Sequence, residues 1–121
     1  MAFKFVDLFA GIGGFHAALS SMGGRCVYAV EIDPRAAAVY KSNWGVNALG
    51  DITQDVSDRD VSVPDHDVLV AGFPCQPFSK SGAQLGMEET RGTLYWNILK
   101  IIKTRRPALV VLENVRNLAG P

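Results

Sequence analysis

The stretch that decides the fold is FKFVDLFAGIGGFHAALSSM, residues 3–22. It opens with a short apolar run, residues 3–9, which ends abruptly at a cluster of glycines. Apolar side chains then recur at helical spacing, at Phe15, Leu19 and Met22. This pattern predicts a strand, a tight turn and a helix, the unit from which parallel α/β sheets are built.

The rest of the chain repeats this alternation. Further strands are predicted at residues 26–32, 48–52, 67–72 and 108–114. Pro34 suits the first turn of an alanine-rich helix, and a broad apolar stripe predicts another helix from about residue 94 to 106. The polar residues 53–66 predict a connection. We therefore predict a parallel sheet in the order 3-2-1-4-5, with ligands at the carboxyl ends of its strands.

The composition is that of one globular domain, since 48% of the 121 residues are apolar and 20% are charged. Twelve basic and twelve acidic side chains cancel, so no overall charge marks a self-sufficient nucleic-acid binder. The two cysteines, Cys26 and Cys75, lack the spacing of a zinc site or a disulfide framework. The N-terminal apolar run is short and contains Asp7, which argues against a signal peptide or a membrane span. We expect a cytoplasmic protein without a metal.

The glycine turn is a candidate nucleotide-binding loop. Gly11, Gly13 and Gly14 let a ligand approach the backbone, and the following helix points free N–H groups at it. Glu31, at the end of the second predicted strand, can accept hydrogen bonds from both hydroxyls of a ribose. His16 replaces the third glycine of a dinucleotide fingerprint, so the turn instead resembles that of S-adenosylmethionine-dependent methyltransferases. The simpler alternative is a plain turn beside a solvated glutamate.

The end of the third predicted strand extends this candidate site. Asp51 can accept a hydrogen bond from an adenine amino group, while Ile52 and Phe9 hold the ring between them. These residues favour an adenosine-containing cofactor.

A second loop at the same edge of the sheet has the sequence GFPCQPFS, residues 72–79. Pro74 and Pro77 remove two backbone donors and stiffen the loop, which suits a nucleophile held in a fixed orientation. Cys75 is therefore a candidate nucleophile. A free cysteine is more often a small buried hydrophobe, and we expect that role for Cys26.

Six segments, in order, resemble the first six conserved motifs of DNA (cytosine-5)-methyltransferases, especially the bacterial restriction-modification type. They are FVDLFAGIGGF, EIDP, GDIT, GFPCQPFS, RGTLYWNIL and ENV. The resemblance covers essentially all of the chain. It implies a Rossmann-like methyltransferase fold, of which residues 1–121 form the N-terminal portion of the catalytic domain. It also implies methyl transfer from S-adenosylmethionine to carbon 5 of cytosine in double-stranded DNA.

The resemblance implies a role for each matching residue. Cys75 would add to carbon 6 of cytosine, and Glu113 would donate a proton to N3, kept neutral by desolvation at the end of an apolar strand. The residues expected to bind the cofactor are Phe9, Gly11, Gly13, Gly14, Glu31, Ile32, Asp51, Ile52, Pro74 and Leu94. Those expected to contact DNA are Gln76, Ser79, Lys80 and Arg91.

The segment from Ser79 to Arg91 is expected to be a loop that closes over a flipped-out cytosine. Its expected hinges are Gly82, Gly86 and Gly92. The histidines and tryptophans occupy no motif position that needs their chemistry, so we expect them to be structural.

Residues 108–112 form a continuous apolar run, typical of a parallel strand covered on both faces, yet little sequence follows to cover it. The motifs that follow ENV in the family, including the region that reads DNA sequence, are also missing. We therefore expect a fragment, or one subunit of a split enzyme, that is inactive without a complementing C-terminal segment or subunit.

Two other interpretations stay open. One is a fragment of the related tRNA cytosine-5 methyltransferase, which shares the Pro-Cys loop. The other is a non-catalytic cofactor-binding module, against which the intact Cys75 and Glu113 argue. The DNA target sequence cannot be predicted, because specificity resides in the missing segments.

Overall fold

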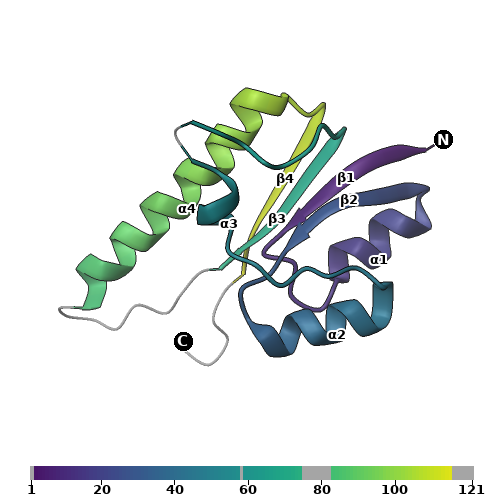
Figure 1. Ribbon diagram of the computed structural model, residues 1–121, viewed down its shortest axis with the longest axis horizontal. Helices are drawn as coiled ribbons and strands as arrows, with labels where there is room; N and C mark the ends of the chain where they lie inside the picture. The colour runs from purple at the N-terminus through teal and green to yellow at the C-terminus, as the bar shows by residue number, and fades with distance from the viewer. Residues whose placement is uncertain (1, 58, 75–82, 116–121) are drawn as a thin grey trace.

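The computed structural model describes residues 2–57, 59–74 and 83–115. The helices and strands in this part of the chain are β1 (Phe3–Leu8), α1 (Gly14–Ser21), β2 (Gly24–Val30), α2 (Pro34–Trp44), α3 (Ile52–Asp55), β3 (Val68–Pro74), α4 (Ala83–Arg105) and β4 (Leu109–Val115). The four strands are parallel and lie in the order β2-β1-β3-β4. Figure 1 shows α1 and α2 on one face of this sheet and α4 with α3 on the other.

The sheet confirms the predicted order for the second, first, fourth and fifth predicted strands. The predicted strand at residues 48–52 lies beside the end of β2, as expected, but it is reduced to an isolated parallel bridge between Leu49 and Glu31. Asp51 explains the difference. Its Oδ1 accepts hydrogen bonds from Thr53 N, at 2.9 Å, and Thr53 Oγ1, at 2.7 Å, so the chain turns into α3 instead of continuing along β2.

The larger part of the core lies between the sheet and α4. Side chains alternate along β1, so Val6 and Leu8 face α4, while Phe5 and Asp7 face α1 and α2. The buried members of the larger cluster are Val6, Leu8, Val30, Ile52, Val56, Val61, Val63, Leu69, Ala71, Ile98 and Ile101. The two faces of the sheet therefore carry separate clusters, and Asp7 and His16 are buried polar side chains on the α1 side.

The connection from α3 to β3 contributes more to the core than its polar composition predicted. Val56, Val61 and Val63 are all buried in the larger cluster. Arg105, at the end of α4, donates hydrogen bonds to the carbonyl oxygens of Val61, at 2.9 Å, and Val63, at 2.7 Å. A guanidinium group thus fixes the path of a segment that forms no strand within the sheet.

Helix α4 is longer than predicted at its N-terminal end. It begins at Ala83, so Gly86 and Gly92 lie inside a helix, and the expected loop from Ser79 to Arg91 is helical from residue 83 onward. Leucine, methionine and glutamate residues in its first turns have high helix propensity, which offsets a cost of about 1 kcal/mol for each glycine. The helix ends at Arg105, close to the predicted end.

Strand β4 lies at the edge of the sheet, and its apolar side chains are largely uncovered in the described part of the chain. Leu109 is 54% exposed, Val111 36% and Leu112 49%. Leu109 and Val111 pair with Val68 and Val70 of β3, so they share the face on which α1 packs, but α1 packs mainly against β1, β2 and β3 and leaves them exposed. The expected uncovered strand is therefore found.

Candidate functional site at the carboxyl ends of the strands

The turn after β1 has a backbone conformation that few residues adopt. Phe9, Gly11 and Gly13 all have positive φ angles, of 56°, 59° and 103°. Phe9 is not a glycine, and holding it in this region costs on the order of 1 kcal/mol. Two hydrogen bonds of 3.0 Å fix the turn, from Ala10 N to Val30 O and from Gly13 N to Ala10 O. The turn is thus held tightly at the carboxyl ends of β1 and β2.

Glu31 connects this turn to the loop after β2. Its Oε1 accepts a hydrogen bond from Gly11 N at 2.8 Å, and its Oε2 accepts one from Asp33 N at 3.0 Å. A carboxylate oxygen has two lone pairs, so each oxygen can accept a second hydrogen bond from a ligand hydroxyl. The neighbouring Ile32 is 68% exposed and presents an apolar surface beside this carboxylate.

The N-terminus of α1 lacks the side-chain cap that α2 and α3 possess. Asp33 and Asp51 accept hydrogen bonds from backbone N–H groups in the first turns of α2 and α3. The N-cap of α1 is Gly13, which has no side chain to do so. Its first-turn N–H groups, beginning with Gly14, are therefore available to an anionic ligand.

Phe9 and Ile52, predicted to hold an adenine ring, and Leu94, predicted to bind the cofactor, belong to one cluster. Phe9 and Leu94 are half-buried and pack against the cluster that contains Ile52. Ile52 itself is only 3% exposed, so Phe9 and Leu94 offer more surface to a ligand. Both hydrogen bonds that Asp51 accepts fall on Oδ1, and among the described residues none falls on Oδ2. That oxygen can accept from an amino group.

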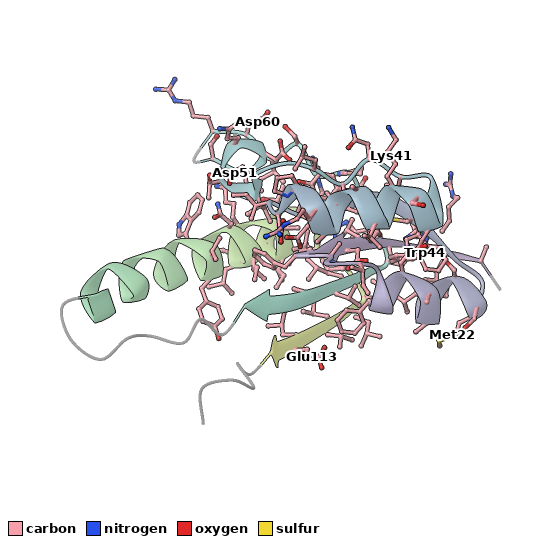
Figure 2. All side chains as sticks on the ribbon, turned by 90° about the horizontal axis from the view of Figure 1, so that it is seen from below. Met22, Lys41, Trp44, Asp51, Asp60 and Glu113 are labelled. Carbon is pink, nitrogen blue, oxygen red and sulfur yellow. The ribbon has the colours of Figure 1, made fainter. Side chains whose placement is uncertain are left out.

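A hollow of about 460 Å³ lies between the glycine turn and β4, on the α1 face of the sheet. Its lining residues are Phe9, Ala10, Gly11, Gly14, Phe15, Ala18, Gly72 and Glu113. Glu113 pairs with Gly72 in the sheet, and Figure 2 shows its side chain near the tip of β4. The hollow thus brings the expected acid together with the expected cofactor turn.

The expected desolvation of Glu113 is not found in the described part of the chain, where its side chain is exposed. The sequence suggested burial because apolar residues precede it, but no described segment covers the side chain of Glu113. Any burial of this carboxylate requires a segment that covers the edge strand.

Several predicted residues fall outside the described residues, namely Cys75, Gln76, Ser79, Lys80 and the hinge Gly82. Arg91 lies within α4, but its side chain is not described. Pro74 is the last residue of β3 and pairs with Val115. Strand β3 therefore continues two residues beyond the level of Glu113.

Sequence reasoning missed four residues that pack under the glycine turn. His16 and Trp44 were expected to be merely structural, and Asp7 and Tyr40 were given no part in the site. In the structure, the Trp44 indole lies where a Cβ on Gly13 would be, with Nε1 2.1 Å from that position. Only the replacement of the third fingerprint glycine by His16 hinted at this arrangement.

The described residues contain neither a group of metal ligands nor a helix that could span a membrane. No group of three or more histidine, cysteine, aspartate or glutamate side chains is placed there to hold a metal ion. None of the helices described is long and apolar enough to cross a membrane.

Comparison with known proteins gives a consistent result. Residues 3–121 match the family model of C-5 cytosine-specific DNA methylases. The chain is 65% identical over 123 residues to the Type II methyltransferase M.AluI of Cellulosimicrobium cellulans, covering 98% of this chain and 24% of that protein. It is 52% identical to the Type II methyltransferase M.HhaI of Haemophilus parahaemolyticus, covering 97% of this chain and 35% of that protein.

A solved structure shows the same fold. The chain superimposes on the S. pombe Dnmt2 methyltransferase with a TM-score of 0.70 and 26% identity, covering 96% of this chain and 35% of that one. In each of these comparisons the chain spans between about a quarter and a third of the matched protein's length.

Proposed function

We propose, for a chain that belongs to the C-5 cytosine-specific DNA methylase family, that it carries the cofactor turn and the nucleophile of a DNA (cytosine-5)-methyltransferase. The observation that carries the proposal is the parallel pairing of Gly72 with Glu113 beside the glycine turn. This pairing brings the start of the cysteine loop, the expected acid and the cofactor turn to one edge of the sheet.

S-adenosylmethionine fits the donors and acceptors present at this edge. The uncapped N-terminus of α1 would hold its carboxylate, and Glu31 would accept from its ribose hydroxyls. Asp51 Oδ2 would accept from the adenine amino group, with Phe9 and Leu94 against the ring. The remaining cofactor residues in this proposal are Gly11, Gly13, Gly14, Ile32, Ile52 and Pro74. When bound, S-adenosylmethionine supplies a methyl group activated by its sulfonium.

The chain's own residues account for the activation of cytosine. The Cys75 thiolate adds to carbon 6, which moves an electron pair toward carbon 5 and builds negative charge at N3. Glu113 donates a proton to N3 and so stabilises this charge. After carbon 5 has gained the methyl group, a base removes its proton. The released electron pair restores the ring double bond and expels the Cys75 sulfur as a thiolate, while N3 returns its proton to the Glu113 carboxylate.

The cytosine must leave the duplex for Cys75 to reach carbon 6. We assign contacts with double-stranded DNA to Gln76, Ser79 and Lys80, which precede α4 in the sequence, and to Arg91, which lies within α4. Their family motif positions support this assignment. The activity would take place in the cytoplasm, where bacterial DNA is accessible.

We further propose that residues 1–121 are the N-terminal portion of a catalytic domain and are inactive alone. The exposed apolar side chains Leu109, Val111 and Leu112 support this, as does a chain about a quarter as long as the Cellulosimicrobium relative. A complementing C-terminal segment or subunit would cover β4 and bury Glu113.

A hybrid protein tests the proposal. This chain replaces the matched segment of the Cellulosimicrobium relative, and transfer of a radioactive methyl group to duplex DNA is measured with the wild-type and Cys75→Ser hybrids. We expect methylation of cytosine by the wild-type hybrid, and none by the variant or by the 121-residue chain alone. A folded hybrid without activity would argue against a catalytic role for this chain. Activity of the isolated chain would overturn the need for a complement.

A further inference from the structure

Three buried polar side chains from three elements form a continuous hydrogen-bonded chain beneath the glycine turn. Asp7 of β1 is 1% exposed, and its Oδ2 accepts a hydrogen bond from the Tyr40 hydroxyl of α2 at 3.0 Å. The same hydroxyl lies 2.7 Å from Nδ1 of His16, a buried residue of α1. Burying these groups without partners would cost on the order of 1–3 kcal/mol each. Their mutual pairing satisfies them.

The chain of hydrogen bonds ends at His16, which stacks on Trp44, and Trp44 contacts the turn directly. The imidazole of His16 stacks on the Trp44 indole, with ring centroids 4.4 Å apart and planes inclined by 12°. Trp44 Nε1 donates to the carbonyl oxygen of Ile12 at 3.4 Å and occupies the space beside Gly13. In Figure 2, Trp44 lies between α1 and α2. The position of the indole therefore limits the positions that the turn can adopt.

Asp7, His16, Tyr40 and Trp44 will be called the turn support. None of the four lines the hollow beside Glu113, and Phe5 packs edge-on against His16, at 5.3 Å, on the core side. A purely structural cluster would satisfy the same contacts. A structural cluster and a positioning device differ in one respect: only in a positioning device would a change of protonation within the cluster alter the glycine turn.

The protons in the turn support are coupled, because the Tyr40 hydroxyl has only one to donate. When Asp7 is ionised, Tyr40 donates to it, and His16 must present a protonated Nδ1 to the tyrosine oxygen. When Asp7 is neutral, its own proton can go to Tyr40, whose hydroxyl is then free to donate to Nδ1. The protonation state of Asp7 thus selects the tautomer of the ring that stacks on Trp44.

The groups around Asp7 favour a change of protonation near neutral pH. Burial raises the pKa of the Asp7 carboxyl to about 7, and the negative charge of Glu31 adds to this. Burial lowers the pKa of His16, so its imidazole stays neutral in the same range. The other titratable group facing Asp7 from the neighbouring strand is Cys26, whose sulfur lies 3.8 Å from the Tyr40 hydroxyl.

We propose that the turn support is a positioning device that couples the protonation of Asp7 to the geometry of the glycine turn and so to cofactor affinity. The inference rests on the proposed cofactor, S-adenosylmethionine. Neutral Asp7 favours binding, because an ionised carboxylate under the turn opposes a second carboxylate at the N-terminus of α1. Affinity therefore falls as the pH rises through neutrality.

The first test measures the Kd for S-adenosylmethionine of the hybrid by calorimetry from pH 6.5 to 8.5. We expect the wild-type Kd to rise about 3- to 10-fold across this range, and Asp7→Asn to remove that rise, because asparagine still accepts from Tyr40 but cannot ionise. Tyr28→Phe is the matched control. It removes another tyrosine hydroxyl that bonds a carboxylate, that of Asp55, away from the turn support, and should keep the pH profile.

The second test needs no cofactor and uses the 121-residue chain. The sequence has two tryptophans, so Trp96→Phe leaves Trp44 as the only tryptophan, whose emission can be excited selectively over that of tyrosine. We expect its emission to titrate with a midpoint near pH 7, and Asp7→Asn or Tyr40→Phe to abolish that step. Trp44→Phe in the hybrid keeps the stacked ring but loses the bond to Ile12, and should weaken cofactor binding about 5-fold.

The outcomes separate this inference from the proposed function. A hybrid that fails to bind S-adenosylmethionine at any pH contradicts the proposed cofactor, while the Trp44 titration still tests the turn support. A hybrid that binds it with the same pH profile before and after Asp7→Asn, together with an unchanged Trp44 titration, overturns the positioning role. A difference in thermal stability alone, without either pH effect, also counts against it.

Discussion

The side chain of Glu31 accepts a hydrogen bond from the backbone N–H of Gly11, with 2.8 Å between Oε1 and N. This contact joins the ends of two adjacent strands, β1 and β2, and it leaves lone pairs on both carboxylate oxygens for a ligand. A single side chain thus both shapes the glycine turn and offers acceptors to a ribose in the proposed site.

Glu31→Gln is expected to raise the Kd for S-adenosylmethionine in the hybrid about 10- to 100-fold. The amide has one acceptor oxygen, so it cannot accept from both Gly11 and Asp33 and also from two hydroxyls, a loss of about 1.4–2.7 kcal/mol. Calorimetry measures the change. The matched control is Glu113→Gln, which should leave this Kd within about 2-fold. Equal effects of the two substitutions would contradict the assigned roles.

Gly13→Ala is expected to destabilise the chain by about 3 kcal/mol. The new Cβ would meet Trp44 Nε1 at 2.1 Å, and alanine is strained at a φ of 103°. Gly14→Ala is the control, because nothing lies within 4 Å of its Cβ position and its φ is not positive. Chemical denaturation of the two variants should differ by at least about 2 kcal/mol. Similar stabilities would show that Trp44 does not confine the turn.

Asp7→Asn should remove part of the pH dependence of stability. Burial raises the pKa of Asp7 from 3.8 to about 7, so the native state holds a proton that the unfolded state releases between these values. The contribution of Asp7 to stability is therefore present below about pH 4 and is lost as the pH rises to about 7. Above pH 7 the variant should be more stable than wild type by about 2–4 kcal/mol.

To test the predicted direction of this pH dependence, the difference in unfolding free energy between the variant and wild type is measured at pH 4.5, 6 and 8. A difference that stays constant with pH would show that Asp7 does not titrate in this range.

Cys75→Ser and Glu113→Gln are expected to impair catalysis to different degrees in the hybrid. Removing the thiolate removes the covalent step, so methyl transfer should fall by at least about 1,000-fold. Removing the proton donor leaves the nucleophile, so a loss of about 100-fold is expected. Single-turnover methyl transfer measures both, with cofactor affinity as the control for folding. Full activity of either variant would remove that residue from the mechanism.

The apolar side of β4 predicts the behaviour of the chain in isolation. Leu109 and Val111 are exposed on one face, so the 121-residue chain should bind a hydrophobic dye and self-associate at micromolar concentration. The double substitution Leu109→Lys and Val111→Lys should reduce both effects in the chain. In the hybrid, the same substitutions should reduce activity, because they disrupt the contact with the complementing segment. Unchanged dye binding and self-association of the chain, together with unchanged activity of the hybrid, would contradict the proposal that another segment covers β4.

The sequence predicted the elements that depend on local patterns. The strand before Gly11 and the strand ending near Glu113 both lie beside β3, as expected. Their positions could be predicted because hydrophobic periodicity identifies the strands and the handedness of crossovers restricts their order. Local patterns could not reveal that Asp51 caps a helix instead of ending a strand, since both roles place a carboxylate after an apolar pair. Nor could they show that α4 begins at Ala83 and continues as a helix through Gly86 and Gly92.

The turn support was missed for a different reason. Asp7 and Tyr40 are 33 positions apart, and His16 and Trp44 are 28 apart, so no motif spacing links them. Only the packing of α1 and α2 against the same face of the sheet brings them together. The exposure of Glu113 likewise depends on which segments cover β4, and not on the residues around it in sequence.

Covalent trapping tests the central claim most directly. The hybrid is incubated with S-adenosylmethionine and duplex DNA that contains 5-fluorocytosine, in which the fluorine on carbon 5 prevents the elimination of the cysteine sulfur. Intact mass and peptide analysis should show one methylated DNA strand joined to Cys75, no adduct with Cys75→Ser, and none with 5-fluorocytosine in tRNA. Attachment at another residue, or an adduct with tRNA but not DNA, would contradict the account.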